Sequence, residues 1–343
     1  MEKENITDNS DLLKRIGNLI EQARTHLLNE VNATMTYTYF EIGRAIVEDE
    51  QNGNYRSAYG TKVLEKLSEK LTLEFGKGFS KRNLEQMRKF YITYHSLLTN
   101  EKTQTLSSQF VLSWSHYLFL MNIDDLNERN FYETEAANQH WSLRELKRQF
   151  NSALYERLAL SKDKDAVTEM SKQGIIVEKP EDIVKDPYIL EFLGLPENKS
   201  YSESKLEQSI IDKLQDFLLE MGKGYTFVGR QVRLTLDEKH FYVDLVFFNR
   251  LLQCFVLIDL KIGEISHQDL GQMQMYVNYY DRRVKLPNEN PTIGIVLCKK
   301  KDDTLVELTL PDNNTQIFAS KYQTVLPNKE ELRRLLDEHL SQE

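Results

Sequence analysis

Two aspartates and a lysine stand in the otherwise apolar stretch 241–261, which reads FYVDLVFFNRLLQCFVLIDLK. The apolar residues predict two β-strands around a turn near 251–252, and counting outward from this turn places Asp244 opposite Asp259. Asp259 and Lys261 are two residues apart and therefore share a face of their strand. Because like charges opposite one another are destabilising, a cation between the aspartates would explain the arrangement. Hard carboxylate oxygens suit Mg²⁺ or Mn²⁺.

The same two aspartates have a second interpretation, in which each one ends its strand and faces water. Register counted from a turn can be displaced by one residue. Such a displacement would put Asp244 and Asp259 on opposite faces of the sheet, and no cation could then lie between them. The sequence leaves both interpretations open.

Three further polar residues lie on helices that flank this pair. Glu207 falls on the apolar stripe of a predicted helix over 204–221, although Ser204-Lys-Leu-Glu207 is also a capping box, which would give the glutamate a structural role. Gln272 and Tyr276 are four residues apart in the helix that follows the second strand, and therefore share a face that could contact a phosphate. The same spacing also occurs on ordinary surface helices.

The chain reads as a helical N-terminal half followed by an α/β half, and the candidate residues lie in the α/β half. From residue 10 to about 160, apolar residues at three- and four-residue spacing predict helices, and we predict an all-α domain over 1–165. Residues 166–185 are charged and lack the apolar periodicity of the helices, which predicts a linker there. A second domain is predicted over 186–343. Its predicted elements are a helix at 204–221, strands at 225–236, 241–249 and 254–261, a helix at 267–282, strands at 292–300 and 315–320, and a helix from about 328. A strand, a crossover helix and a further strand predict a parallel pair in a mixed sheet flanked by helices.

A basic segment in the helical half, 76–91, reads GKGFSKRNLEQMRKFY. A preceding helix and a tight turn resemble a helix-turn-helix, whose second helix would enter a DNA groove. The alternative is a solvated basic helix packed on its neighbours. The aromatic-rich segment 35–43 favours helix packing or a homodimer seam. In the first interpretation the candidate nucleic-acid contacts are Lys77, Lys81, Arg82, Arg88 and Lys89.

The composition of the 343 residues, 40% hydrophobic and 28% charged, is typical of a globular protein. A net charge of −9 argues against binding of nucleic acid over the whole surface, but not against a local basic patch. We find no apolar run of the roughly 20 residues that a membrane helix needs, no export signal and no GxxxxGK[ST] loop. Cys254 and Cys298 fall in strand-like runs and are expected in the core. We therefore expect a cytoplasmic protein without membrane contact, structural zinc or nucleotide cofactor.

The order of the motifs, a helix with Glu, a strand with Asp, a strand with Asp-x-Lys and a helix with Gln-x-x-x-Tyr, resembles the PD-(D/E)XK nuclease superfamily. Most of the chain resembles, more closely, the bacterial YhcG-like proteins. These join a helical N-terminal domain to a nuclease domain with the restriction-endonuclease-like fold. Besides the strand pair, the phrases that carry this resemblance are WSLRELKRQ, KDPYILEFLGL, GQMQMYVNYYD and PTIGIVLCKK.

The resemblance implies roles for the candidate residues. Asp244, Asp259 and the backbone carbonyl of Leu260 would bind a metal ion, and Lys261 would orient or help deprotonate the attacking water. Glu207 matches the acidic residue of the first helix. Gln272 and Tyr276 match the motif of the exonuclease-like branch. The proline of the superfamily's name is absent, since Val243 precedes the first aspartate.

The function implied by the resemblance is a Mg²⁺-dependent deoxyribonuclease, for which Mn²⁺ could replace Mg²⁺, acting in nucleic-acid processing or defence. The helical domain would supply DNA binding, partner contacts or dimerisation. The alternative is a PD-(D/E)XK fold without catalysis that serves as a DNA-binding or protein-interaction module. The complete set of Asp244, Asp259 and Lys261 argues against a decayed site.

Overall fold

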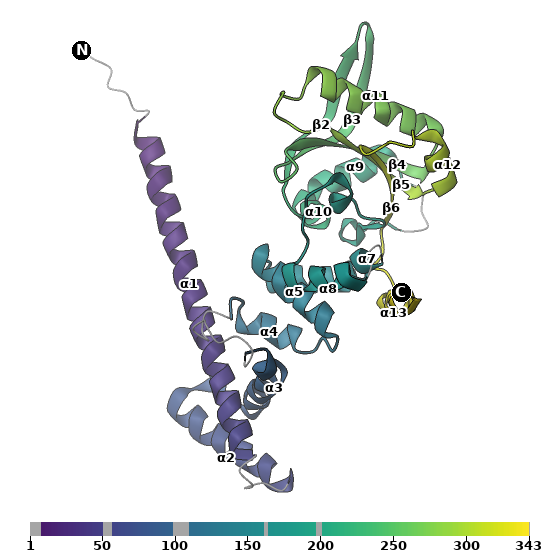
Figure 1. Ribbon diagram of the computed structural model, residues 1–343. Helices are drawn as coiled ribbons and strands as arrows, with labels where there is room; N and C mark the ends of the chain where they lie inside the picture. Colours follow the sequence, from purple (N-terminus) through teal and green to yellow (C-terminus); the bar gives the residue numbers. More distant parts are fainter. Residues whose placement is uncertain (1–7, 51–56, 99–109, 161–163, 197–200, 343) are drawn as a thin grey trace, which may run out of the picture. The chain divides into compact units, whose positions relative to one another are not determined.

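The computed structural model describes residues 8–50, 57–98, 110–160, 164–196 and 201–342 (Figure 1). The chain divides between Leu143 and Arg144 into two compact units. No helix in these ranges combines the length and the apolar character needed to cross a membrane.

The regular elements in the described residues of the first unit are all helices, as the sequence predicts. Aromatic residues fill its core, where Phe90 contacts Phe40, Phe110 and Tyr117. Gly43 allows close approach of the first and third long helices, because a Cβ atom there would lie 2.1 Å from the Met87 carbonyl oxygen. The helices are α1 (Asp8–Asp49), α2 (Ser57–Phe75), the 3₁₀ turn η2 (Lys77–Phe79), α3 (Lys81–Leu98), α4 (Trp114–Leu120) and α5 (Leu126–Asn138).

The second unit is built on a six-stranded mixed sheet in the order β1-β6-β5-β4-β3-β2. The pairs β2–β3 and β3–β4 are antiparallel, whereas β4–β5, β5–β6 and β1–β6 are parallel. The predicted parallel pair on either side of a crossover helix, here β4 and β5, is therefore confirmed. The strands are β1 (Tyr188–Ile189), β2 (Tyr225–Leu236), β3 (Lys239–Asn249), β4 (Cys254–Glu264), β5 (Ile293–Lys300) and β6 (Ile317–Gln323).

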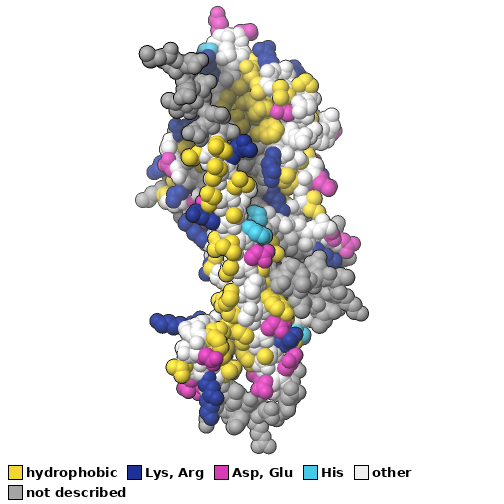
Figure 2. Space-filling model, turned by 90° about the vertical axis from the view of Figure 1, so that its left-hand side faces the viewer, with side chains coloured by type: hydrophobic (Ala, Val, Ile, Leu, Met, Phe, Trp, Pro, Cys, Tyr) yellow, Lys and Arg dark blue, Asp and Glu magenta, His cyan; other side chains and the backbone are white. Residues whose placement is uncertain are grey.

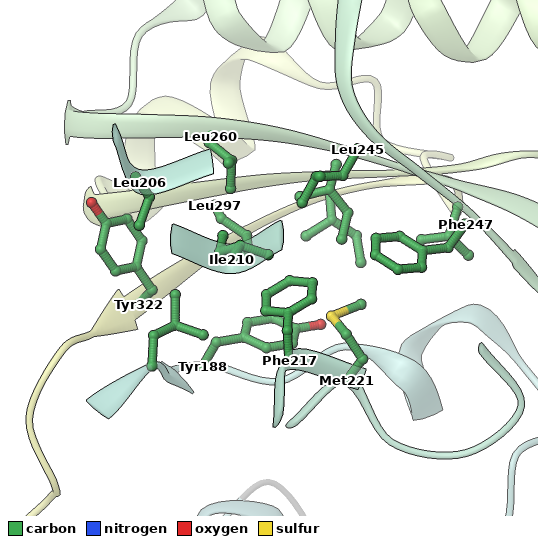
Figure 3. Packing of buried hydrophobic residues seen from close by; sticks show 14 of the residues in the cluster. Tyr188, Leu206, Ile210, Phe217, Met221, Leu245, Phe247, Leu260, Leu297 and Tyr322 are labelled. Atoms are coloured by element: carbon green, nitrogen blue, oxygen red, sulfur yellow. The ribbon is translucent and has the colours of Figure 1, made fainter. Parts of the chain in front are cut away.

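Helices cover both faces of this sheet (Figure 1). Phe217 and Ile210 pack with Phe247 and other strand residues on one face, as Figure 3 shows, and Met273 packs with Val246 on the other. Burial on both faces explains why the central strands read as continuous apolar runs. The helices are α6 (Leu143–Asn151), α7 (Leu154–Ala159), α8 (Lys164–Gln173), η4 (Pro180–Ile183), η5 (Glu191–Leu193), α9 (Glu203–Asp212), α10 (Leu214–Met221), α11 (His267–Arg283), α12 (Asp303–Thr309) and α13 (Lys329–Gln342).

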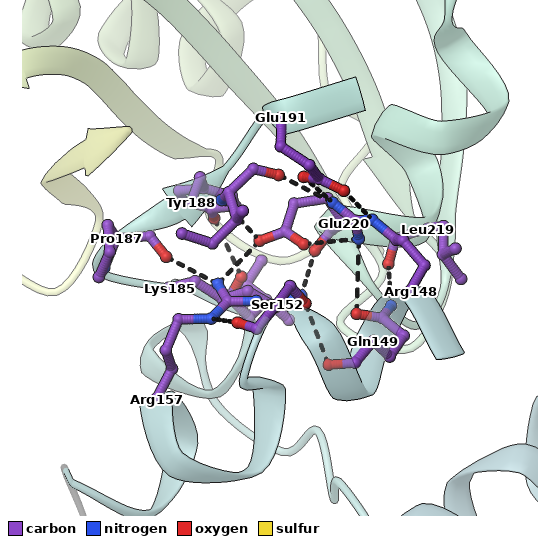
Figure 4. Close-up of polar contacts among 12 residues, drawn as sticks. Arg148, Gln149, Ser152, Arg157, Lys185, Pro187, Tyr188, Glu191, Leu219 and Glu220 are labelled. Atoms are coloured by element: carbon purple, nitrogen blue, oxygen red, sulfur yellow. Dashed lines mark hydrogen bonds and ion pairs between the residues drawn. The ribbon is translucent and has the colours of Figure 1, made fainter. Parts of the chain in front are cut away.

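Three features of the second unit differ from the predicted elements. The helix predicted over 204–221 is two helices that meet at Lys213. The short elements β1 and α12 were not predicted. The predicted linker contains α8 and η4, and the division between compact units lies earlier in the chain, because α6 and α7 are tied to α10 by ion pairs. These run from Arg148 and Arg157 to Glu220 (Figure 4).

Candidate active site

Asp244 lies where β3 separates from β4. The paired residues run from Asn249–Cys254 to Leu245–Ile258, which confirms the register counted from the turn. Continued by one residue, the same register places Asp244 beside Asp259. At this point a side chain replaces the backbone as the hydrogen-bond partner of β4. Asp244 Oδ2 accepts a hydrogen bond from the Leu260 N–H at 2.8 Å. The chain thus fixes this carboxylate at the junction of the two strands.

Asp259 and Lys261 meet on one face of β4. The Lys261 Nζ lies 2.8 Å from Asp259 Oδ2 and 3.7 Å from Asp269 Oδ1. Burial lowers the pKa of Lys261, but the charge of Asp259 outweighs this effect and the pKa is raised above its ordinary value. The lysine is therefore protonated at neutral pH, and its ammonium group lies beside a buried carboxylate.

Asp259 is 3% exposed and incompletely bonded. Burial raises its pKa to about 6, with Asp244 adding to the shift and Lys261 opposing it. Within the described ranges, its Oδ2 has no hydrogen-bond partner. The Lys261 ammonium group lies 2.8 Å from this oxygen and forms an ion pair with it. One oxygen of a buried carboxylate is thus left with capacity for a further ligand.

Glu207 is joined to Asp244 by a residue that the sequence analysis missed. The Gln231 Nε2 donates to Glu207 Oε2 at 2.7 Å and to Asp244 Oδ1 at 2.9 Å. The alternative of a helix cap for Glu207 is wrong, because α9 begins at Glu203 and its cap is Ser202, whose Oγ accepts from the Lys205 N–H. No pattern in the sequence indicates a role for Gln231. Its φ of 47° interrupts the pairing of β2 with β3 at this residue, and this angle cannot be read from the sequence.

Gln272 and Tyr276 lie together on α11, as their spacing predicts. The Gln272 amide donates to the Tyr276 hydroxyl, which in turn donates to the Tyr242 carbonyl oxygen at 2.9 Å. Burial raises the pKa of Tyr276, and the charges of Asp259 and Asp244 raise it further. The pair therefore lies near the acidic residues and also holds the segment of β3 that has left β4.

Asp269 is a further residue near the site that the sequence analysis did not select. Its Oδ2 accepts from the Ser266 N–H and hydroxyl at the start of α11, in a capping box. Its Oδ1 faces Lys261. The pattern Ser-x-x-Asp ahead of an apolar helix is a readable signal for the cap, but not for the second contact.

The oxygen atoms at this site suit a hard divalent cation. Over the part of the chain that the structure describes, no three His, Cys, Asp or Glu side chains gather as a closed metal site. The available donors are the lone pairs of the Asp259 carboxylate that its ion pair with Lys261 leaves unused, and the remaining lone pairs of the Asp244 carboxylate. A cation bound there would need further ligands from a backbone carbonyl, water or substrate, which is the ligand set that Mg²⁺ usually takes.

The predicted nucleic-acid contacts of the first unit divide into two groups. Lys81 pairs with Glu65 at 2.6 Å, and Arg88 pairs with Glu50 at 2.7 Å. Lys89 donates to an asparagine side chain of the same unit at 2.7 Å. The other two, Lys77 and Arg82, are exposed. The short turn η2 does join α2 to α3, but a role in DNA binding remains a prediction.

Comparisons with known proteins give the family. The model of the YhcG PDDEXK nuclease domain matches residues 181–337, and the DUF1016 N-terminal domain matches residues 15–157. The chain is 41% identical over 347 residues to the "Putative nuclease YhcG" of Escherichia coli (strain K12), covering 94% of this chain and 91% of that one. This chain belongs to the YhcG family. The resemblance stated from the motifs is thereby confirmed.

The second unit is accordingly a PDDEXK-type nuclease domain of the YhcG family, preceded by the helical domain that the family also has. A crystal structure of a repair endonuclease from Pyrococcus abyssi is similar over 37% of this chain and 50% of that chain, with 15% identity and a TM-score of 0.25. The predicted fold class, helical and then a mixed sheet with flanking helices, agrees with the family.

Proposed function

We propose that this YhcG-family protein is a metal-dependent deoxyribonuclease that hydrolyses phosphodiester bonds at the site formed by Asp244, Asp259 and Lys261. The observation that carries the proposal is the buried Asp259 carboxylate, whose Oδ2 lies 2.8 Å from the protonated Lys261 ammonium group and whose pKa burial raises to about 6. Perturbed groups that converge in this way are typical of functional sites.

The metal proposed is Mg²⁺, with Mn²⁺ as a substitute, held by Asp244, Asp259 and the Leu260 carbonyl. When bound, such an ion acts as a Lewis acid and lowers the pKa of the water that it holds. The Leu260 N–H fixes the orientation of Asp244 before any ion binds.

The ammonium group of Lys261 has the second chemical role. Because it stays protonated, it can stabilise the negative charge that develops on the phosphate during hydrolysis, and it can orient the attacking water. Asp259 and Asp269 hold it in place. Gln272 and Tyr276 are proposed to contact the phosphate or its backbone near the same carboxylates, and Glu207 to support Asp244.

DNA is proposed as the polymer because of the basic turn between α2 and α3, where Lys77 and Arg82 are exposed. A local basic segment is the feature expected of a DNA-binding helix in a chain that is acidic as a whole. The first unit would then hold the polymer while the second one cleaves it.

The test is a panel of circular, linear and single-stranded DNA and an RNA of matched sequence, each with Mg²⁺, Mn²⁺ or EDTA. We expect cleavage of DNA that needs the divalent ion. Asp259→Asn and Lys261→Met should each lower the rate by at least about 100-fold, the scale on which removal of one charge-stabilising group slows an enzyme. Circular dichroism would verify that both variants fold.

The matched control is Asp303→Asn. Asp303 also pairs with a lysine, Lys301 at 2.9 Å, but on an exposed surface of the same unit. Its loss should leave the rate unchanged. DNA bound without cleavage under every ion would favour the inactive binding module, and cleavage that survives Asp259→Asn would refute the assigned site.

A further inference from the structure

We infer that Gln231 is a positioning residue of the active site, which holds Glu207 and Asp244 in one orientation. The inference rests on the proposed nuclease function and extends it to a residue that no family motif marks. Three observations carry it: the bonds of its amide group, the backbone conformation that aims the amide, and the way that the remaining oxygen of Asp244 is bound.

The amide of Gln231 uses both of its N–H groups on carboxylates. One contact of 2.7 Å reaches Glu207 on α9, and one of 2.9 Å reaches Asp244 on β3. The two carboxylate partners fix the orientation of the Gln231 amide. The amide N–H groups can donate to carboxylate oxygens, whereas the amide carbonyl oxygen has no hydrogen to donate. The positive end of a neutral dipole thus lies between two acidic groups and reduces their mutual repulsion.

The backbone of Gln231 is held in the left-handed region to make these contacts. Its neighbours Arg230 and Val232 pair with Leu245 and Val243 of β3, whereas Gln231 itself, opposite Asp244, has a φ of 47°. This conformation is unfavourable for a residue other than glycine, and it persists only where the surroundings enforce it. The local backbone is therefore strained at the residue that connects the acids.

Asp244 is consequently fixed through both of its oxygens. Gln231 holds Oδ1, and the Leu260 N–H holds Oδ2. Each oxygen keeps a lone pair for a cation, while rotation of the carboxylate would break one of the two bonds. A partner that orients a ligand in this way usually changes metal affinity or activity by about 10- to 100-fold when it is lost.

Gln231→Gly separates a positioning role from a structural one. Glycine adopts a φ of 47° without strain, so the variant should keep the backbone conformation of β2 and lose only the amide contacts, and circular dichroism should be unchanged. Its affinity for Mn²⁺, measured by titration calorimetry, should fall about 10-fold or more, and cleavage should fall with it. A merely structural residue would lower stability and leave the affinity unchanged.

Two further variants make the test specific. Gln208→Ala removes a neighbouring glutamine that bonds to Asp212 and Arg230 and not to the two acids, and should leave Mn²⁺ affinity unchanged. In a Glu207→Gln background, Gln231→Gly should have a smaller effect than in the parent protein, because the amide then has one charged partner fewer. Parent protein that cleaves no DNA with any ion would contradict the proposed function. Active parent protein with an unaltered Gln231→Gly variant would contradict this inference alone.

The first half of α1 also carries an apolar face open to solvent, from which no inference is drawn because nothing in the structure shows what covers it. The residues of this face recur at three- and four-residue spacing over about 30 Å of helix. They are between 47% and 76% exposed, and Figure 2, which looks onto this side, shows hydrophobic side chains gathered along it. The residues are Leu12, Leu13, Ile16, Leu19, Ile20, Leu27, Leu28 and Val31.

Discussion

Glu220 and Asp259 are two buried carboxylates of the same unit with opposite surroundings. Glu220 accepts from Arg148 and Arg157 at 2.8 Å each and from the Ile189 N–H at 3.0 Å, and Lys185 donates to its backbone carbonyl (Figure 4). Burial alone would raise its pKa, but the surrounding cations outweigh burial and hold the pKa well below the ordinary value. Asp259 pairs, among the described residues, with Lys261 alone, and burial raises its pKa to about 6.

The difference distinguishes a carboxylate that stabilises the fold from one that is available for chemistry. A buried charge whose partners are all present stabilises the fold, because removing any one partner would leave another buried charge uncompensated. Charge buried with incomplete partners makes the folded state less stable and is retained where a ligand completes it. Three substitutions test whether the two carboxylates divide in this way.

The largest effect is expected from Glu220→Gln. The substitution leaves the buried Arg157 without the anion of Glu220 and Arg148 with Glu191 as its remaining anion, and breaking a buried pair of this kind costs roughly 3–5 kcal/mol. The free energy of unfolding, measured in urea, should fall by that amount, and the helices α6 and α7 should become sensitive to proteolysis. Glu191→Gln, which removes a more accessible partner of Arg148, should cost less. Equal stability of Glu220→Gln and the parent protein would show that the network does not hold the unit together.

Asp259→Asn, in the presence of EDTA, is expected to raise the free energy of unfolding rather than lower it. A folded pKa of about 6, against an ordinary value of 3.8, corresponds to about 3 kcal/mol of destabilisation once the group is ionised. The amide carries no charge, so the variant should be more stable than the parent protein by up to that amount at pH 8. This is the behaviour of a site whose function lowers stability.

The pH dependence of this gain follows from the raised pKa. A group whose folded pKa is raised stabilises the fold below its unfolded pKa, and this stabilisation is lost as the pH rises through the folded value. The advantage of Asp259→Asn should therefore be small near pH 4, grow between pH 4 and pH 6, and be constant above pH 7. Urea unfolding at a series of pH values measures it. An advantage that does not change with pH would have to come from packing rather than from charge.

The sequence predicts Asp259 and its neighbours because their geometry is local. Four turn residues separate Asn249 from Cys254, so counting along two strands is enough to bring Asp244 next to Asp259. Alternation then assigns Lys261 to the face of Asp259. The family resemblance depends on the same short-range motifs, and the order of elements in the second unit follows from the apolar pattern of each segment.

The sequence does not predict Glu220, because its partners are distant along the chain. Arg148 and Arg157 are 72 and 63 residues away. Nothing in the pattern of α10 separates Glu220 from an exposed acidic residue. The domain limits depend on this contact, since α6 and α7 read as a continuation of the helical half until their arginines are seen to bond inside the second unit. Gln231 was missed for a different reason, namely a backbone angle that side-chain pattern does not encode.

The smallest effect is expected from Tyr276→Phe, which tests how much of the Asp259 region is structural. The substitution removes the hydroxyl that donates to the Tyr242 carbonyl and accepts from Gln272. Loss of one such bond costs about 1 kcal/mol, so the free energy of unfolding should fall by that amount. Gln272→Leu should add little to it, because both substitutions break the same chain of bonds. Urea unfolding of the two single variants and the double variant gives the coupling directly, and cleavage rates of the same proteins show whether the hydroxyl acts beyond this bond. A rate that falls much further than stability would assign Tyr276 to the reacting phosphate; a rate that follows stability would assign it, with Glu220, to the framework.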